Sequence, residues 1–168
     1  MNTPKDIILD HAQIKGIITR LAWQIYENNM DESLIWIAGI DERGACIAEM
    51  ISEELSKICQ LELRTVSIVI DRKNYEPSYY SEFDIEEMKN STVVLVDDVL
   101  NTGKTIVCAM LPLVQRQVAK LQLAVLASRS HRLFPVYANF VGISMATTLQ
   151  EHLNFDMSDE ANLKLTLS

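Results

Sequence analysis

Three stretches of the chain repeat apolar residues at the spacing of an amphipathic helix. Asp10 and Gln13 stand before the first stretch in the arrangement of a capping box, so we expect a helix from about Asp10 to Asn29. A second helix is expected to follow the turn at 41–44, DERG. A third begins near Lys104 and contains Pro112, which is expected to kink or shorten it. The apolar positions of the first two helices are Ile14, Ile17, Ile18, Leu21, Ile25, Ile47, Met50, Ile51, Leu55 and Ile58.

Short apolar runs between these stretches predict strands. A further set of alternating leucines at 163, 165 and 167 predicts an edge strand. Because strands alternate with helices, the pattern predicts an α/β fold with a parallel sheet and a ligand site at the carboxyl ends of its strands. The apolar runs lie at 34–40, 63–70, 93–96, 121–127 and 137–142.

A long polar segment at 71–90 separates two of the predicted strands. A compact domain seldom keeps a connection of this length without a use for it, and a lid over a ligand is a common use. A plain surface loop, with its tyrosines packed on the body of the protein, is the alternative.

Composition and charge exclude several classes of protein. The 168 residues, of which 48% are hydrophobic, suit a single domain with a core of two or three layers. The formal net charge of −8 opposes bulk attraction to nucleic acid or anionic lipid. Cys46, Cys59 and Cys108 show no zinc-site spacing and suggest a reducing compartment. No apolar stretch spans a bilayer and no signal peptide is evident, so a cytoplasmic location without a membrane partner is expected.

The segment from Ser91 to Thr105, STVVLVDDVLNTGKT, joins a buried strand to the chemistry of a phosphate site. Asp97 and Asp98 end the apolar run, and residues 101–103 form a turn. The next helix directs its free N–H groups and its positive dipole end toward that turn. Acceptors for vicinal hydroxyls beside donors for a phosphate fit a ribose 5-phosphate.

Two other interpretations of this segment explain fewer of its residues. Residues 103–105, GKT, resemble the end of a Walker A loop, but Asp98 stands where the first glycine of G-x-x-x-x-G-K is required. A strand followed by a polar turn and a helix cap explains the hydroxyls but leaves two adjacent carboxylates unexplained. A site for a phosphorylated sugar is therefore favoured.

At these residues the sequence resembles the type I phosphoribosyltransferases. The family's signature for phosphoribosyl pyrophosphate is four apolar residues, two acids, two apolar residues, any residue and TGxT, and Val93 to Thr105 conforms throughout. Segments 8–29, 37–55, 66–72 and 121–142 resemble one branch, the pyrimidine operon attenuator and uracil phosphoribosyltransferase family. The resemblance implies an α/β fold with a five-stranded parallel sheet, flanking helices and a small hood. It further implies one domain over residues 1–168, with 71–90 as a flexible hood loop.

The resemblance also implies roles for individual residues. Asp97 and Asp98 would stabilise the positive charge that develops on the ribose as pyrophosphate leaves, with Mg²⁺ beside them bound mainly through substrate oxygens. Arg72, the arginine of the hood loop, completes the expected catalytic set. The residues expected to bind phosphoribosyl pyrophosphate are Asp41, Glu42, Arg43, Gly44, Asp97, Asp98, Asn101, Thr102, Gly103, Lys104 and Thr105.

Two segments depart from the family pattern. Residues 41–44 correspond to the pyrophosphate loop, where backbone amides and Arg43 would hold the leaving group. Relatives often carry Thr or Lys where Asp41 and Glu42 stand, and two extra negative charges could weaken substrate binding unless Mg²⁺ or an outward orientation compensates. At 128–132 the chain reads SRSHR where the family has DRGHR. For Arg43, the alternative to a role in binding pyrophosphate is that of an ordinary surface arginine exposed to solvent.

The accepted base is expected to be a pyrimidine. Purine enzymes usually place an aspartate at the position of Asn101 to handle a ring proton, which a neutral amide cannot accept. In the resembled branch, main-chain groups of the strand ending FVG contact uracil, which would place Phe140 and Val141 beside the base. Uracil ranks first, and a purine or another base is the alternative. The expected partners are thus phosphoribosyl pyrophosphate and a nucleobase, in a homodimer or higher homo-oligomer.

An RNA-binding attenuator that senses nucleotides through the same site is the alternative of a different class. Family members that bind the transcript use a histidine in the first helix and a lysine after the FVG strand, where Trp23 and Ile143 stand here. Thr19, His131 and Arg132 are retained. Because RNA binding requires positive charge against phosphates and the net charge is −8, RNA is not the favoured partner.

Overall fold

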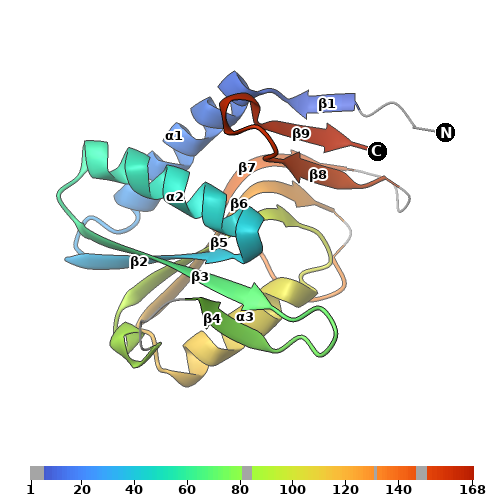
Figure 1. The fold of residues 1–168 in the computed structure, drawn as a ribbon. Helices are drawn as coiled ribbons and strands as arrows, with labels where there is room; N and C mark the ends of the chain where they lie inside the picture. Colours follow the sequence, from blue (N-terminus) through green and yellow to red (C-terminus); the bar gives the residue numbers. More distant parts are fainter. Residues whose placement is uncertain (1–5, 81–84, 131, 147–150) are drawn as a thin grey trace.

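The computed structural model describes residues 6–80, 85–130, 132–146 and 151–168. Within these ranges, six strands form one sheet in the order β4-β3-β2-β5-β6-β7. Helices α1 and α2 cover one face of the sheet and α3 covers the other (Figure 1). The strands are β2 (Leu34–Ile40), β3 (Glu62–Ile70), β4 (Pro77–Tyr80), β5 (Thr92–Leu100), β6 (Lys120–Arg129) and β7 (Phe140–Met145), and the helices are α1 (His11–Glu27), α2 (Asp41–Ile58) and α3 (Lys104–Gln115).

The predicted α/β fold with five parallel strands is confirmed. Strand β2 pairs in parallel with β3 and β5, and β5, β6 and β7 continue the parallel order. The sequence pattern did not predict β4, which adds an antiparallel pair at the β3 edge. Alternate side chains of β5 enter two separate cores: Val94 and Val96 face α1 and α2, whereas Val93 and Leu95 face α3. Burial on both faces explains the unbroken apolar run.

The first helix starts as its capping box predicts. The backbone N–H of Gln13 donates to the Asp10 carboxylate at 2.8 Å, and the Asp10 N–H donates to the Gln13 side chain at 2.9 Å. The helix ends at Glu27, before the predicted Asn29. Asn29 instead turns its buried side-chain amide toward the Ile25 carbonyl and Gln122.

Several predicted strand bounds are corrected by the pairing of neighbouring strands. The acid pair does not end β5, because the strand stays paired with β6 as far as Leu100. The last parallel strand begins at Phe140 instead of Tyr137 and runs to Met145, opposite the carboxyl half of β6. Helix α3 continues past Pro112 to Gln115.

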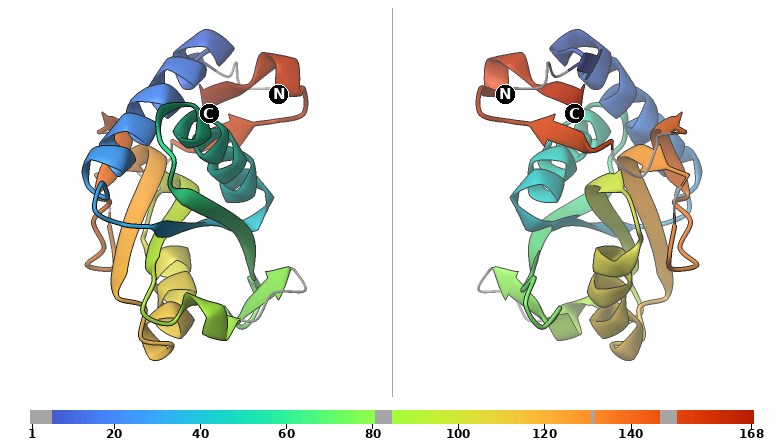
Figure 2. Two further views of the ribbon diagram at one scale, coloured as in Figure 1. Left: turned by 90° about the vertical axis from the view of Figure 1, so that its left-hand side faces the viewer. Right: turned by 90° about the vertical axis from the view of Figure 1, so that its right-hand side faces the viewer.

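The alternating leucines at 163–167 do not form an edge strand. Strand β9 (Lys164–Leu167) is the middle strand of a second, antiparallel sheet, between β1 (Asp6–Leu9) and β8 (Leu153–Asp156). Figure 2 shows this small sheet beside α1 and α2, away from α3. Buried Phe155 and Leu165 join it to the core under those helices. Tertiary pairing of the two ends of the chain therefore decides the place of β9.

The polar segment at 71–90 contains β4 and the short 3₁₀ helix η1 (Ile85–Met88), while residues 81–84 lie outside the described ranges. Its interpretation as a flexible hood loop, and the assignment of one domain to 1–168, stay predictions. A second short helix, η2 (Glu160–Asn162), precedes β9. In the described part of the chain, none of the helices has the length and apolar character that a bilayer span requires.

Candidate active site

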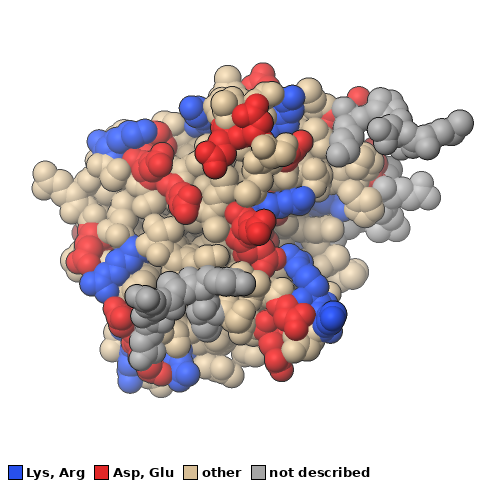
Figure 3. All heavy atoms as spheres, in the orientation of Figure 1, with Lys and Arg blue, Asp and Glu red and all other residues tan. Residues whose placement is uncertain are grey.

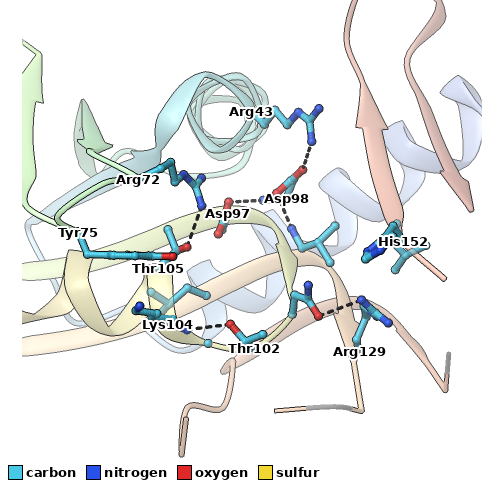
Figure 4. A pocket seen from close by; sticks show the side chains of 15 residues that line it. Arg43, Arg72, Tyr75, Asp97, Asp98, Thr102, Lys104, Thr105, Arg129 and His152 are labelled. Atoms are coloured by element: carbon cyan, nitrogen blue, oxygen red, sulfur yellow. Dashed lines mark hydrogen bonds and ion pairs between the residues drawn. The ribbon is translucent and has the colours of Figure 1, made fainter. Parts of the chain in front are cut away.

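The acid pair and the turn that follows it line a cavity of about 330 Å³ at the carboxyl edge of the sheet. Figure 4 shows the side chains that converge on it from α2, the turn after β3, β5, the start of α3, β6 and the start of β8. The sequence predicted such a site at this edge, because parallel strands present their carboxyl ends together. Of the predicted set, the lining includes Arg43, Arg72, Asp97, Asp98, Asn101, Thr102, Gly103, Lys104 and Thr105.

The two carboxylates are held by the backbone of β5 itself. Asp97 Oδ1 accepts the N–H of Asp98 at 2.9 Å, and Asp98 Oδ1 accepts the N–H of Val99 at 2.8 Å. Burial raises the pKa of Asp97 well above its usual range, and the carboxylates of Asp98 and Asp41 contribute in the same direction. Two acids that share one site thus differ in environment, since the other oxygen of Asp98 faces Arg43 at 3.5 Å.

The start of α3 is shaped to receive an anion. Its N-cap is Gly103, which has no side chain to cap the helix and adopts a φ of 87° that favours glycine. The Thr102 hydroxyl accepts the N–H of Lys104 at 3.4 Å. The N–H groups of Leu133 and Phe134 both donate to the Thr102 carbonyl at 3.0 Å, so a later loop fixes this turn from behind. The N-cap residue of the helix supplies no side-chain cap, so the first N–H groups and the dipole of the helix remain available to a phosphate.

The second predicted turn, at 41–44, is the first turn of α2 and not a loop before it. Asp41 follows β2 directly, with a φ of 52°, and its Oδ1 accepts the N–H of Ile70 at 2.9 Å. Gly44 is buried against β5, where a Cβ would lie 2.6 Å from the Val96 carbonyl oxygen. The close approach of α2 to β5 brings Arg43 to the acid pair.

Arg72 and Tyr75 reach across the cavity from the turn that follows β3. Arg72 is bound to the Asp41 carboxylate and donates to the Thr105 hydroxyl at 2.9 Å. The Lys104 ammonium lies 3.6 Å from the centre of the Tyr75 ring, a cation–π contact. The sequence predicted Arg72 at the site, but the role of Tyr75 depends on a turn that periodicity does not reveal.

A second cavity, of about 780 Å³, lies beside the first on the α2 side. It shares four residues with the first cavity: Arg43, Arg72, Asp97 and Asp98. Asp41 and Glu42 line only this second cavity. The two predicted phosphate segments therefore meet across the acid pair.

The end of the site near β6 is arranged around Arg129, which is 4% exposed. Its guanidinium donates to Asn101 Oδ1 at 2.9 Å, which leaves the NH₂ group of the Asn101 amide as the group available for a ligand. Arg132 donates to Ser128 Oγ at 2.7 Å, and Ser130 Oγ donates to the Met145 carbonyl at 3.4 Å. The serines that depart from the family pattern thus make hydrogen bonds of their own. His131 lies outside the described residues.

The predicted base contacts lie deeper than the cavity lining. The Phe140 side chain is buried in the core, and the Val141 carbonyl accepts a hydrogen bond from Arg20 at 3.2 Å. Because β7 begins late, Phe140 and Val141 stand opposite residues 124 and 125 of β6, at the level of Val96 and Asp97 in β5. Neither residue lines the two cavities.

His152 and Leu153 line the cavity from the opposite side, and sequence reasoning missed both. They stand at the start of β8, where His152 exchanges backbone hydrogen bonds with Ser168 at 2.7 and 3.0 Å. The pairing of β8 with β9 brings them to the cavity that the acid pair lines. Nothing in their local sequence marked them as site residues.

The described residues hold no cluster of three or more His, Cys, Asp or Glu side chains that would enclose a metal ion. Asp97 and Asp98 offer carboxylate oxygens at one point. Such a pair suits Mg²⁺, which is usually held by one or two carboxylates together with water and substrate phosphates. The donor set therefore fits a cation that arrives with a phosphorylated ligand.

Comparisons with known proteins agree with this geometry. The model of the phosphoribosyl transferase domain matches residues 4–157. The chain is 36% identical over 154 residues to the bifunctional protein PyrR of Streptococcus thermophilus, covering 89% of this chain and 88% of that protein. With the bifunctional protein PyrR of Fusobacterium nucleatum it shares 34% identity over 161 residues, 91% of each chain.

Solved structures share the fold at lower identity. A hypoxanthine phosphoribosyltransferase from Staphylococcus aureus superposes with a TM-score of 0.72 at 18% identity, over 89% of this chain and 85% of that one. A hypoxanthine phosphoribosyltransferase from Trypanosoma cruzi gives 0.75 at 15% identity, over 88% and 81%. At such low sequence identities, the similarity to these structures supports the fold and no statement about function.

Proposed function

The chain belongs to the phosphoribosyltransferase family, and from this membership we propose that it transfers ribose 5-phosphate from phosphoribosyl pyrophosphate to a nucleobase and releases pyrophosphate. One observation carries the proposal: the acid pair shares one cavity with the uncapped N-terminus of α3 and with two arginines, Arg43 and Arg72. A sugar with a phosphate at one end and a pyrophosphate at the other requires these three groups in one site.

The first part of the proposed chemistry is binding of the two charged ends. The 5-phosphate is held by the N–H groups of α3 and the hydroxyls of Thr102 and Thr105. The pyrophosphate is held by Arg43 and Arg72, whose planar guanidinium groups bind phosphate oxygens through paired hydrogen bonds. The two ends then place the ribose over Asp97 and Asp98.

The second part is stabilisation of the charge that develops when the C1–oxygen bond breaks. Positive charge spreads over the ribose ring, and the carboxylates of Asp97 and Asp98 near the ring hydroxyls oppose it. Mg²⁺ beside the two carboxylates, when bound, neutralises the leaving pyrophosphate. The nitrogen of the base forms the new bond to C1 and gives up its proton, and the pyrophosphate departs with the bonding electrons and can take up that proton.

Uracil is the base that we favour. Asn101 is oriented by Arg129 to present an NH₂ group, which donates to a carbonyl oxygen but cannot accept a purine ring proton. The backbone of Phe140 and Val141 remains the proposed contact for the base, at the sheet level of Val96 and Asp97. A purine is the alternative.

The test is release of pyrophosphate from phosphoribosyl pyrophosphate by the purified full chain, with and without Mg²⁺, against uracil, hypoxanthine, guanine, xanthine and adenine. We expect Mg²⁺-dependent release with uracil. Release with hypoxanthine or guanine alone would assign a purine enzyme, and no release with any base would contradict the transferase function.

A second candidate function is RNA binding regulated by nucleotides, because the curated relatives carry the name bifunctional. The local charge does not favour it: Figure 3 shows Lys and Arg interspersed with Asp and Glu on the face that carries α2 and β3. Two residues shared with the transcript-binding relatives already have partners within the protein. The Thr19 hydroxyl donates to the Lys15 carbonyl and to Glu54, and the Arg132 guanidinium lies 4.7 Å from the centre of the Tyr137 ring. Filter binding of a pyrimidine-operon leader transcript at physiological salt separates the two functions.

The homodimer or higher oligomer implied by the resemblance is part of the same proposal. Light scattering of the full chain over a range of concentrations measures it directly.

A further inference from the structure

The guanidinium of Arg72 joins the two phosphate segments of the site. One of its nitrogens binds the Asp41 carboxylate at the start of α2, and another donates to Thr105 Oγ1 at the start of α3. Asp41 is fixed on its other side, because its Oδ1 accepts the N–H of Ile70. The Asp41–Arg72–Thr105 bridge therefore spans the boundary between the two cavities, and Figure 4 shows its Arg72–Thr105 half.

Both guanidinium groups of the second cavity already face carboxylates. Arg72 faces Asp41 and Arg43 faces Asp98, while Glu42 adds a further acid to the lining. An incoming polyanion must therefore exchange these partners for its own oxygens. Of the two arginines, only Arg72 is held by an acid outside the reacting pair.

We propose that Asp41 limits the affinity of this site for pyrophosphate, free or as part of phosphoribosyl pyrophosphate, by competing for Arg72. The proposal rests on the proposed function for the identity of the ligand. Asp41 is a positioning residue in this role, because it acts through Arg72 and not on the reacting atoms. The bridge opens when a pyrophosphate oxygen replaces the carboxylate oxygen on the guanidinium.

The size of the effect follows from the exposure of the pair. The side chain of Arg72 is 62% exposed and that of Asp41 is 26% exposed, so their attraction is largely screened by water. Loss of the competing carboxylate, together with loss of its repulsion toward a polyanion, should tighten binding roughly tenfold. The pair is thus weak enough for a ligand to displace and strong enough to lower its affinity.

Asp41→Asn is the variant that isolates the competition. Asparagine keeps an oxygen for the Ile70 N–H and tolerates the φ of 52°, but it loses the charge that binds Arg72. Glu42→Gln is the matched control, because it removes one negative charge from the adjacent position of the same cavity. The titration measures Kd for pyrophosphate with Mg²⁺ by calorimetry, on the full chain.

We expect Asp41→Asn to lower Kd roughly tenfold and Glu42→Gln roughly twofold. In an Arg72→Gln background the effect of Asp41→Asn should fall to that of Glu42→Gln, because the shared partner is gone. KM for phosphoribosyl pyrophosphate should fall in Asp41→Asn, whereas damage to the fold would raise it. Equal effects of the two variants, weaker binding by Asp41→Asn, or an undiminished effect without Arg72 would each overturn the role of Asp41.

Failure of this role and failure of the transferase function give different results. Turnover with an unchanged pyrophosphate Kd in Asp41→Asn would overturn only the role of Asp41. Pyrophosphate binding that responds to Asp41→Asn, with no turnover of any base, would overturn only the transferase. No pyrophosphate binding by any variant would overturn both.

Discussion

Strands β2 and β5 lie side by side and in parallel, and each leads into a helix at the same edge of the sheet. After β5, a turn at 101–103 separates the strand from α3, and Gly103 leaves the helix N-terminus open. After β2, α2 begins at once, with Asp41 and Glu42 in its first turn. The two junctions share their topology and differ in charge and in the presence of a turn.

The difference shows that a strand-helix junction is not by itself a phosphate site. Acids in the first turn of a helix complement its dipole, so α2 already carries anionic groups at the end that would otherwise attract a ligand. The junction of α3 carries none, and its dipole is left for a phosphate. On the proposed function, affinity at the β2–α2 junction is expected to depend on arginines, and affinity at the β5–α3 junction on backbone N–H groups.

The largest expected effect is at the acid pair. Asp98→Asn should lower kcat on the order of 10²-fold or more, because it removes a preorganised charge opposite the developing positive ring. Asp97→Asn should lower it similarly. The control is Asp31→Asn on an exposed turn before β2, which should keep the wild-type rate. Unchanged steady-state kinetics in both site variants would show that Asp97 and Asp98 do not take part in catalysis.

The glycines distinguish the two junctions by stability. A Cβ at Gly39 would lie 2.4 Å from the Ala45 Cα, so Gly39→Ala should push α2 away from β2 at a cost of about 3 kcal/mol. Gly103→Ala should cost only about 1 kcal/mol, from its left-handed backbone. Urea unfolding measures both. If the two variants lost the same free energy of unfolding, close packing of the helix on its strand would not distinguish the β2–α2 junction from the β5–α3 junction.

A smaller effect is expected at the open helix end. Thr105→Val is nearly isosteric and should weaken binding of phosphoribosyl pyrophosphate by about 2 kcal/mol. The substitution removes one protein hydroxyl that donates a hydrogen bond to the charged ligand and leaves the backbone N–H groups in place. Thr65→Val on the exposed face of β3 is the control and should leave affinity unaltered. Calorimetry that gives one affinity for all three proteins would place the 5-phosphate elsewhere.

The smallest effect is on pH dependence. The raised pKa of Asp97 means that the native state holds a proton which the unfolded chain releases near the usual value of 3.8. This contribution to stability is present below that value and is lost as pH rises through the raised pKa. Asp97→Asn has no proton to lose, so its unfolding temperature relative to wild type should rise from acid to neutral pH. A relative fall in calorimetric scans would contradict the raised pKa.

The local sequence was sufficient wherever neighbouring residues set the structure. The capping box at Asp10 and Gln13 starts α1 as predicted, and the run before the acid pair forms the central strand. The signature at 93–105 placed the acid pair and the phosphate turn in one cavity. These features depend on side-chain periodicity, turn residues and helix ends, which act within a few positions.

Long-range pairing decided what the local pattern could not. Strand β5 continues through the acids because β6 supplies partners for its backbone, and β9 became a middle strand because β1 and β8 pair with it. The same small sheet delivers His152 and Leu153 to the site.

By itself, the sequence determined the fold class, the acid pair and the open end of α3, because these follow from burial periodicity and from chemistry within one short segment. Only the tertiary structure decided that Asp41 points inward to Arg72 and not outward to water. The physical reason is that the hydrogen bond from Ile70 and the charge of Arg72 come from the end of another strand. The effect of an acid in the first turn of α2 therefore depends on the residues that the fold brings next to it.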